Sequence, residues 1–189
     1  MMGIEAGSMI DNLRSLGVEP DDVTDVVFTH LHIDHIGWAS QDGAVTFRNA
    51  TYRCAAPDWD HFMVHHRGSE AERVQPAADR FEHWDADTNL LPGLDTLSTP
   101  GHTPGSTTLV LSSGTERLMF LGDVVHCPVQ LEDDEWGALF DVDPELARRT
   151  RIALAKELEG TDTRVSGAHF PELTFGRLLQ AEGTRRFVV

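Results

Sequence analysis

His30-Leu31-His32-Ile33-Asp34-His35 is the stretch that decides how this chain folds, because four metal-binding side chains occur within it. Neutral imidazoles and a carboxylate are ligands that borderline divalent metals prefer, and an imidazole nitrogen binds zinc at about 2.0–2.1 Å. The β-branched run at 23–28 predicts a short buried strand that leads into the loop. Loops at strand ends are where α/β proteins usually place their chemistry. We therefore interpret 30–35 as a metal-binding loop.

Three later loops each hold one further metal-binding side chain at the end of an apolar segment. His102 lies in a turn with two prolines and two glycines, which lets the backbone approach a ligand closely. Asp123 follows an apolar run that ends in Gly122, and His169 ends another apolar segment. Each residue alone is a weak signal, but together with the first loop they form an ordered series of seven ligands.

This series resembles the metallo-β-lactamase superfamily, whose members carry H-x-H-x-D-H, then a His, a bridging Asp and a last His. The sequence around these ligands most resembles the lactonase and organophosphate-hydrolase-like branch, and glyoxalase II is the next most similar. The segments that carry the resemblance are THLHIDHIGW, TPGHTPGST, LGDVVH and GAHFP. The resemblance implies an α/β fold, the αββα sandwich of this superfamily. It also implies two metal positions that Asp123 bridges, the first held by His30, His32 and His102 and the second by Asp34, His35 and His169.

Two divalent ions about 3.5–4 Å apart can share one water, lower its pKa from about 15.7 toward 7 and so present a bridging hydroxide as the nucleophile. We expect two zinc ions per chain, with iron or manganese as alternatives. Asp34 and Asp123 are the predicted catalytic residues, since Asp34 can also orient the hydroxide or carry a proton to the leaving group. No G-x-S-x-G motif occurs, and neither Cys54 nor Cys127 lies in a motif of a catalytic thiol.

Length and charge limit the remaining classes. The 189 residues predict one domain, 1–189, and no apolar stretch approaches the roughly 18 residues of a membrane span. The absence of a recognisable signal peptide predicts a cytoplasmic location with two free cysteine thiols. The formal net charge of −16 argues against nucleic acid as a partner, because phosphate backbones require clustered Lys and Arg. A small-molecule substrate is therefore expected, with neither nucleic acid nor membrane as partner.

Only 29 residues precede the first loop, whereas superfamily members usually begin with several strands, one ending in a D-x-G turn that supports this loop. We therefore expect an N-terminally truncated version of the fold with an exposed sheet edge. Either the sequence is part of a longer protein or a partner covers that edge, and a homodimer is the preferred prediction. The other predicted elements are helices at 8–16, with Ser8 as N-cap, 57–65, 70–81 and 144–158, and strands at 44–47, 51–54, 94–97, 107–111 and 118–121.

Several residues carry two interpretations. Five aromatic side chains are candidates for an apolar pocket wall or for the core: Trp38, Trp59, Phe62, Trp136 and Phe140. His126 is a candidate for a pocket residue or a partner of the metal ligands, while three histidines at 61, 65 and 66 are interpreted as solvated.

The predicted function is a dinuclear zinc hydrolase of an ester, lactone or phosphotriester. The lactonases carry a tyrosine after the bridging Asp, and the only tyrosine here is Tyr52, which weakens the acyl-homoserine-lactone interpretation. A glyoxalase II-like thiolester hydrolase is an alternative, in which Arg177, Arg185 and Arg186 would bind glutathione carboxylates. A non-catalytic metal-binding or interaction module left by N-terminal loss is the other.

Overall fold

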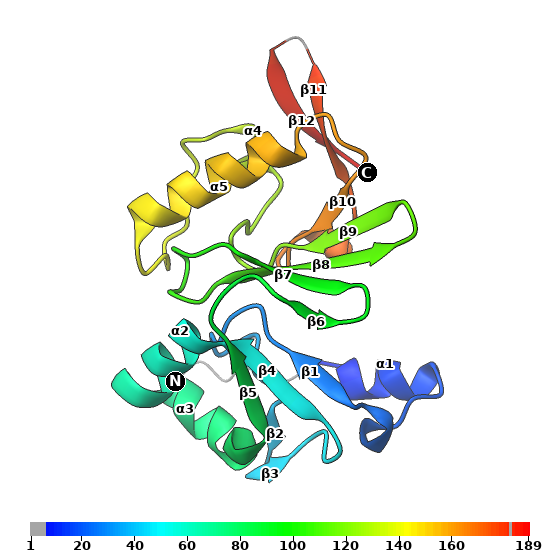
Figure 1. Cartoon of the computed structure of the whole chain (residues 1–189), viewed down its shortest axis with the longest axis vertical. Coiled ribbons are helices and arrows are strands. Elements are labelled where there is room, and N and C mark those ends of the chain that lie inside the picture. Colours follow the sequence, from blue (N-terminus) through cyan, green and yellow to red (C-terminus); the bar gives the residue numbers. More distant parts are fainter. Residues whose placement is uncertain (1–6, 182) are drawn as a thin grey trace. The chain divides into compact units, whose positions relative to one another are not determined.

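The computed structural model describes residues 7–181 and 183–189 and divides into two compact units. Unit 1 ends at Trp84 and unit 2 begins at Asp85, and each is treated by itself below (Figure 1). The interpretation of 1–189 as a single domain stays a prediction. Helices and strands occur in both units, which confirms the α/β class.

Unit 1 is built on a sheet of three parallel strands in the order β1-β4-β5. The strands are β1 (Asp25–Val27), β4 (Thr51–Ala55) and β5 (Phe81–Trp84). The predicted strands at 23–28 and 51–54 are thus confirmed, the first in a shorter form, and Phe28 is buried directly after β1. A small hairpin joins β2 (Ser40–Gln41) to β3 (Ala44–Val45). Its turn has positive φ at Asp42 (49°) and Gly43 (77°), the backbone that Asp-Gly favours in two-residue hairpins.

The helices of unit 1 are short. They are α1 (Met9–Ser15), a 3₁₀ turn (Pro20–Asp22), α2 (Ala56–Trp59), a π-helical turn (Asp60–His65), α3 (Ser69–Val74) and a 3₁₀ stretch (Gln75–Arg80). The helices predicted at 8–16 and 57–65 are confirmed as helical segments. The single helix predicted at 70–81 is wrong: α3 ends at Val74, because Pro76 cannot donate a helical hydrogen bond, and Phe81 already belongs to β5. Ser8 precedes α1 but makes no side-chain cap.

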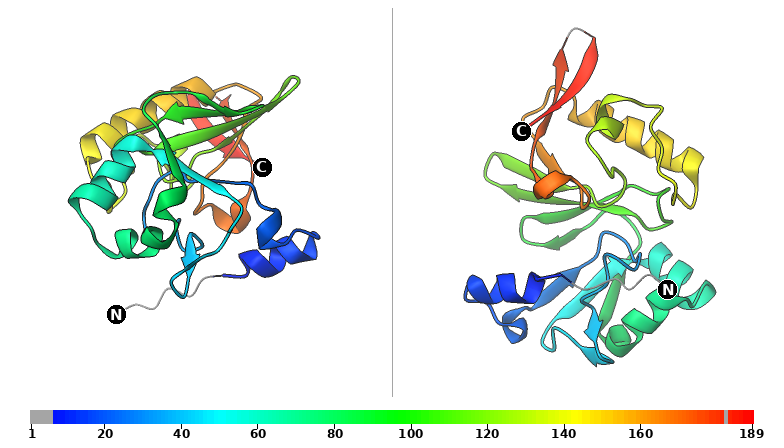
Figure 2. Two further views of the ribbon diagram at one scale, coloured as in Figure 1. Left: turned by 60° about the horizontal axis from the view of Figure 1, so that its bottom comes forward. Right: turned by 180° about the vertical axis from the view of Figure 1, so that it is seen from behind.

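Unit 2 contains a five-stranded sheet in the order β10-β9-β8-β7-β6. Four strands form an antiparallel meander, β6 (Asn89–Leu91), β7 (Leu94–Ser98), β8 (Thr107–Ser113) and β9 (Glu116–Phe120), and β10 (Arg164–Ser166) pairs parallel with β9. The parallel connection runs through α4 (Val129–Glu132) and α5 (Pro144–Leu158). A 3₁₀ turn (Pro171–Leu173) and the hairpin of β11 (Arg177–Ala181) and β12 (Thr184–Val188) complete the unit, as the reverse view in Figure 2 shows.

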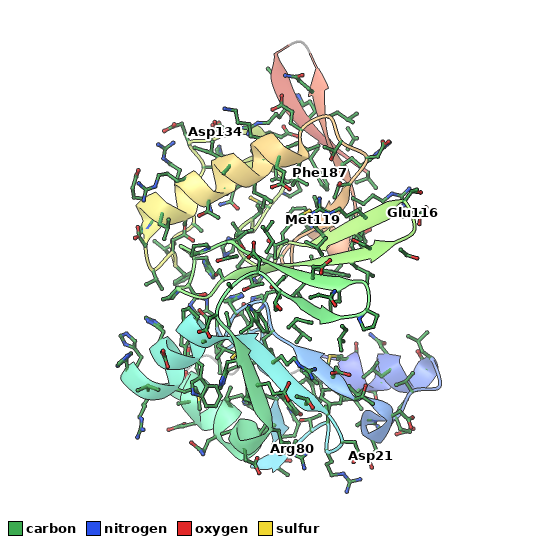
Figure 3. All side chains as sticks on the ribbon, in the orientation of Figure 1. Asp21, Arg80, Glu116, Met119, Asp134 and Phe187 are labelled. Carbon is green, nitrogen blue, oxygen red and sulfur yellow. The ribbon has the colours of Figure 1, made fainter. Side chains whose placement is uncertain are left out.

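α5 is the predicted helix 144–158, confirmed with the same bounds. The Asp143 carboxylate accepts the Leu146 N–H at 3.0 Å, and Pro144 fits the first turn because its missing N–H is not needed there. Leu154 and Leu158 of α5 are buried in one core with Met119 of β9, and Phe187 of β12 packs against the same core (Met119 and Phe187 are labelled in Figure 3). This packing fixes α5 on the sheet of unit 2. Among the helices of the described residues, none is long and apolar enough to cross a membrane.

Candidate metal centre

The loop 30–35 follows β1 of unit 1, and the structure brings its three histidines together. The ring centroids of His30 and His35 lie 4.0 Å apart, and those of His30 and His32 lie 5.0 Å apart. His30 is almost completely buried, whereas the side chain of Asp34 is 44% exposed with Oδ2 3.7 Å from His35 Nε2. The tight turn is closed by the His35 N–H, which donates to the His32 carbonyl at 3.0 Å. Unit 1 thus presents three imidazoles and one accessible carboxylate from six consecutive residues.

A buried carboxylate braces this loop. The Leu31 N–H donates to Oδ2 of Asp58 at 2.9 Å, and both residues are fully buried. Asp58 lies on α2, immediately after β4. The sequence lacks the D-x-G turn that usually supports this loop in the superfamily, and Asp58 was not among the predicted site residues, although an Asp in the first turn of a helix that follows a buried strand was an available signal. Asp58 holds the backbone between His30 and His32, so it is a positioning residue of the loop.

Unit 2 gathers its candidate ligands around Asp123, which follows β9 and is 4% exposed. Its Oδ2 atom lies 3.1 Å from His169 Nε2, 3.2 Å from His126 Nε2 and 3.6 Å from His102 Nε2. Three imidazole nitrogens therefore face one carboxylate oxygen. His126 was only a candidate in the sequence, and the structure places it among the predicted ligands of this unit.

The orientation of His102 is set by a second carboxylate. His102 Nδ1 lies 3.0 Å from Oδ1 of Asp141, and both side chains are buried. An ionised carboxylate only accepts hydrogen bonds, so Nδ1 is the donor in this contact and Nε2 is the ring nitrogen that faces Asp123. Asp141 is in turn 3.7 Å from the buried guanidinium of Arg151, which also donates to the Val124 carbonyl at 3.1 Å. Sequence reasoning missed Asp141 and Arg151.

The turn that carries His102 is locked against α5. Gly101 has φ of 131°, and a Cβ there would lie 2.3 Å from the backbone nitrogen of Ala147, so only glycine fits. The Val142 N–H donates to the His102 carbonyl at 3.0 Å, and the Asp143 N–H donates to the Gly101 carbonyl at 2.9 Å. These contacts couple the His102 turn to the loop that supplies Asp141.

The donor set of unit 2 suits a divalent metal. Ligands at about 2.0–2.1 Å from a tetrahedral ion are separated from one another by roughly 3.3–3.4 Å, and the three Nε2–Oδ2 separations of 3.1, 3.2 and 3.6 Å bracket that length. The lone pair of His102 Nε2 faces a carboxylate oxygen, an arrangement that a cation between them stabilises. A hydrogen bond from the second ring nitrogen to a carboxylate, as between His102 and Asp141, is typical of metal-binding histidines.

A family model described as the metallo-beta-lactamase superfamily matches residues 2–169. The chain belongs to the metallo-beta-lactamase superfamily. Among curated relatives, the N-acyl homoserine lactonase of Bacillus thuringiensis subsp. kurstaki is 28% identical over 158 residues, covering 81% of this chain and 60% of that protein. Metallo-beta-lactamase domain-containing protein 1 of Xenopus laevis is 29% identical over 179 residues, covering 93% of this chain and 67% of that protein. The chain spans 60% of the length of the lactonases that it matches.

Solved structures of the superfamily confirm the predicted metallo-β-lactamase fold class. The hydrolase AbOPH is similar with a TM-score of 0.87 and 26% identity, over 99% of this chain and 71% of that one. The dizinc quorum-quenching lactonase AidC, solved with a product, gives a TM-score of 0.88 at 22% identity, again over 99% of this chain and 71% of that one. At that identity the likeness to AidC concerns the fold alone.

The aromatic candidates of this superfamily member separate into two groups. In unit 1, Phe62 is buried with its ring 5.4 Å from that of His32, while Trp38 and Trp59 pack against the core. In unit 2, Trp136 and Phe140 are 52% and 74% exposed in the loop before α5. Of these five aromatic candidates, Phe62 is the one whose ring contacts a candidate ligand of its own unit.

The cysteines and the tyrosine have structural surroundings. Both Cys54 and Cys127 are free thiols, as predicted. Burial raises the pKa of the Cys54 thiol well above its ordinary value, with the charge of Asp58 adding to the effect, so this thiol stays protonated. Tyr52 is fully buried on β4, and its hydroxyl oxygen accepts the Phe47 N–H at 3.0 Å.

Proposed function

We propose that this chain is a metal-dependent hydrolase that uses two zinc ions to cleave an ester, lactone or phosphotriester bond in a small molecule. The observation that carries the proposal is the convergence of three imidazole nitrogens on Oδ2 of Asp123 in unit 2. The names of similar proteins support it, because they include N-acyl homoserine lactonases and the hydrolase AbOPH.

In this proposal two metal positions share Asp123 as their bridge. Three histidines hold the first ion, and one carboxylate with two histidines holds the second. A bound pair of divalent ions would lower the pKa of a shared water and polarise the oxygen of the bond under attack. The ligands are those predicted from the sequence: His30, His32 and His102 for one ion, and Asp34, His35 and His169 for the other.

The side chains of the chain have distinct tasks. Asp141 accepts the Nδ1–H of His102 and keeps Nε2 directed toward Asp123. Asp58 fixes the backbone from which His30 and His32 project. The 44%-exposed carboxylate of Asp34 is accessible to solvent, which suits a group that orients water or carries a proton to the leaving group.

The substrate is expected to differ from that of an acyl-homoserine lactonase. Tyr52, the only tyrosine, is buried in the core of unit 1 and its hydroxyl group is engaged with Phe47, so it is not available to a leaving group. Another lactone, an ester or a phosphotriester is therefore the proposed substrate class.

The glyoxalase II-like alternative is less well supported. Its expected glutathione-binding arginines are all paired with carboxylates: Arg177 with Asp162 at 2.9 Å, Arg186 with Glu132 at 2.8 Å, and Arg185 with Asp134, which is labelled in Figure 3. Ion pairing reduces the positive charge that glutathione carboxylates would require. A non-catalytic metal-binding or interaction module is the third candidate. The homodimer and the cytoplasmic location stay predictions.

The decisive experiment combines elemental analysis of the purified chain with hydrolysis of a lactone, a thiolester and a phosphotriester. We expect two zinc ions per chain and turnover of the lactone or the phosphotriester that a chelator abolishes and added zinc restores. Asp123→Ala should lose metal at both positions together with turnover, whereas Asp162→Ala, at an exposed carboxylate of unit 2, should retain both.

Three results would contradict the proposal in different ways. Fewer than one metal ion per chain would remove the dinuclear site. Preference for the thiolester would favour the glyoxalase II-like function. Full metal content without turnover of any substrate would favour the non-catalytic module.

A further inference from the structure

His126 lies outside the seven ligands that the superfamily motif supplies, yet it has the contacts of a ligand. Its Nε2 atom is 3.2 Å from Oδ2 of Asp123, nearly the same separation as that of His169, which is 3.1 Å. The ligand atoms of His102, Asp123 and His126 all lie within 4.8 Å of one another. These three residues belong to unit 2 alone.

The position of His126 is fixed by its surroundings rather than by the Asp123 contact alone. The backbone N–H of His126 donates to Oε1 of the buried Gln130 at 2.7 Å. The side-chain amide of Gln130 in turn donates to the Gly137 carbonyl at 3.1 Å. The ring stacks nearly parallel on that of His169, with centroids 5.5 Å apart and an interplanar angle of 8°. The ring of His126 also contacts that of His102, with centroids 4.9 Å apart. The imidazole is therefore held with Nε2 directed at Asp123.

We propose that unit 2 holds a divalent metal ion by itself, through His102, Asp123 and His126. The separations of Nε2 of His102 and of His126 from Oδ2 of Asp123, 3.6 and 3.2 Å, match the edge of a tetrahedral site with ligands at about 2.0–2.1 Å. With Nδ1 directed at Asp141, Nε2 is the ring nitrogen of His102 that faces Asp123. Two neutral imidazoles and one carboxylate are a common ligand set for zinc.

This inference deepens the proposed metal chemistry but does not depend on hydrolysis. In the dinuclear proposal, His102 acts with His30 and His32 of unit 1. The set proposed here has His126 in place of those two histidines. One ion can therefore bind to His102, Asp123 and His126 even when the 30–35 loop lacks its imidazoles.

The test uses the full chain with His30, His32 and His35 all replaced by Gln, which removes the imidazoles of the loop and keeps side-chain size. We expect this parent variant to retain one Zn²⁺ or Co²⁺ ion per chain in equilibrium dialysis. Adding His126→Ala should weaken binding of that ion by roughly tenfold or more, because losing a ligand costs at least as much as losing a group that orients one. The visible spectrum of the Co²⁺-loaded chain should change in the same step.

Two further variants separate metal ligation from other roles of His126. His126→Gln keeps an N–H donor near the position of Nε2 but supplies a poor metal ligand, so we expect it to bind metal as weakly as His126→Ala. His65→Ala removes an exposed histidine of unit 1 and should leave metal binding unchanged. Thermal unfolding of the metal-free variants checks that each is folded.

The inference is overturned if the folded parent variant binds no ion, or if His126→Ala or His126→Gln binds as tightly as the parent. Neither result depends on turnover, because both are read from metal binding. Absent hydrolysis in a chain that passes this test would count against the proposed function only.

Discussion

Asp141 and His102 are joined side chain to side chain across 39 residues, with Oδ1 of the carboxylate 3.0 Å from Nδ1 of the imidazole. The contact decides which ring nitrogen of His102 carries its proton. It also links the turn after β7 to the loop before α5, where the Val142 N–H binds the His102 carbonyl. A residue outside the motif thus orients a predicted ligand inside it.

Replacing Asp141 by Asn is expected to weaken metal binding roughly 10–100-fold, because the groups that orient metal-binding histidines contribute on that scale. The amide can present its NH₂ group to Nδ1 and so reverse the ring tautomer, which would turn a protonated Nε2 toward Asp123. Isothermal titration with Zn²⁺ measures the change. Asp162→Asn, at an exposed carboxylate paired with Arg177, is the matched control and should titrate like the unmodified chain. Equal affinity in both variants would show that the turn alone orients His102.

Asp58→Ala is expected to lower the free energy of unfolding by about 1–3 kcal/mol, because the buried Leu31 N–H loses its acceptor. Metal binding should fall as well, since the backbone between His30 and His32 is no longer held. Urea unfolding and zinc titration measure the two effects. Asp60→Ala, at an exposed position two residues later, should change neither. A loss of stability without a loss of metal affinity would show that Asp58 does not position the loop.

The candidate ligands could be selected from the sequence because each has a local signal. His102 is enclosed by prolines and glycines, and Asp123 and His169 end apolar runs. α5 was predictable for a similar reason, since Asp143 and Pro144 mark its start. Such signals lie within a few residues of the feature that they specify, so one sequence suffices to find them.

The supporting residues were not predictable because their roles arise from distant contacts. Asp58 meets Leu31 across 27 residues, and Arg151 meets Val124 across 27. In the sequence, Arg151 is one charge on a helix, and the periodic pattern places Ile152 rather than Arg151 in the core. In the structure Arg151 is buried, with Nη1 donating to the Val124 carbonyl and Nη2 3.7 Å from the Asp141 carboxylate. Whether a charged side chain such as that of Arg151 is buried depends on tertiary contacts, which a local sequence pattern does not indicate.

Tyr52→Phe should lower the free energy of unfolding by about 1–2 kcal/mol near pH 8, because the Phe47 N–H loses its acceptor. Burial raises the pKa of the Tyr52 phenol in the folded chain. Ionisation therefore favours the unfolded chain, and the contribution of Tyr52 is present below its ordinary pKa of about 10 and is lost as the pH rises through the folded value. Urea unfolding at pH 8 and pH 11 should show a difference in unfolding free energy between the unmodified chain and Tyr52→Phe that is smaller at pH 11. An equal difference at both pH values would contradict a buried phenol.

Gly101→Ala is the substitution expected to disturb His102 without touching a ligand. At φ of 131° an L-residue is strained, and the new Cβ would lie 2.3 Å from the Ala147 nitrogen, so the turn must move away from α5. We expect a loss of about 2 kcal/mol or more in unfolding free energy, since strain and overpacking act together, and weaker zinc binding because His102 shifts with the turn. Gly137→Ala is the control, as a Cβ there meets nothing within 4 Å. Chemical unfolding and zinc titration of the two variants give the comparison, and a Gly101→Ala chain that matches Gly137→Ala in both would mean that the His102 turn is not held against α5.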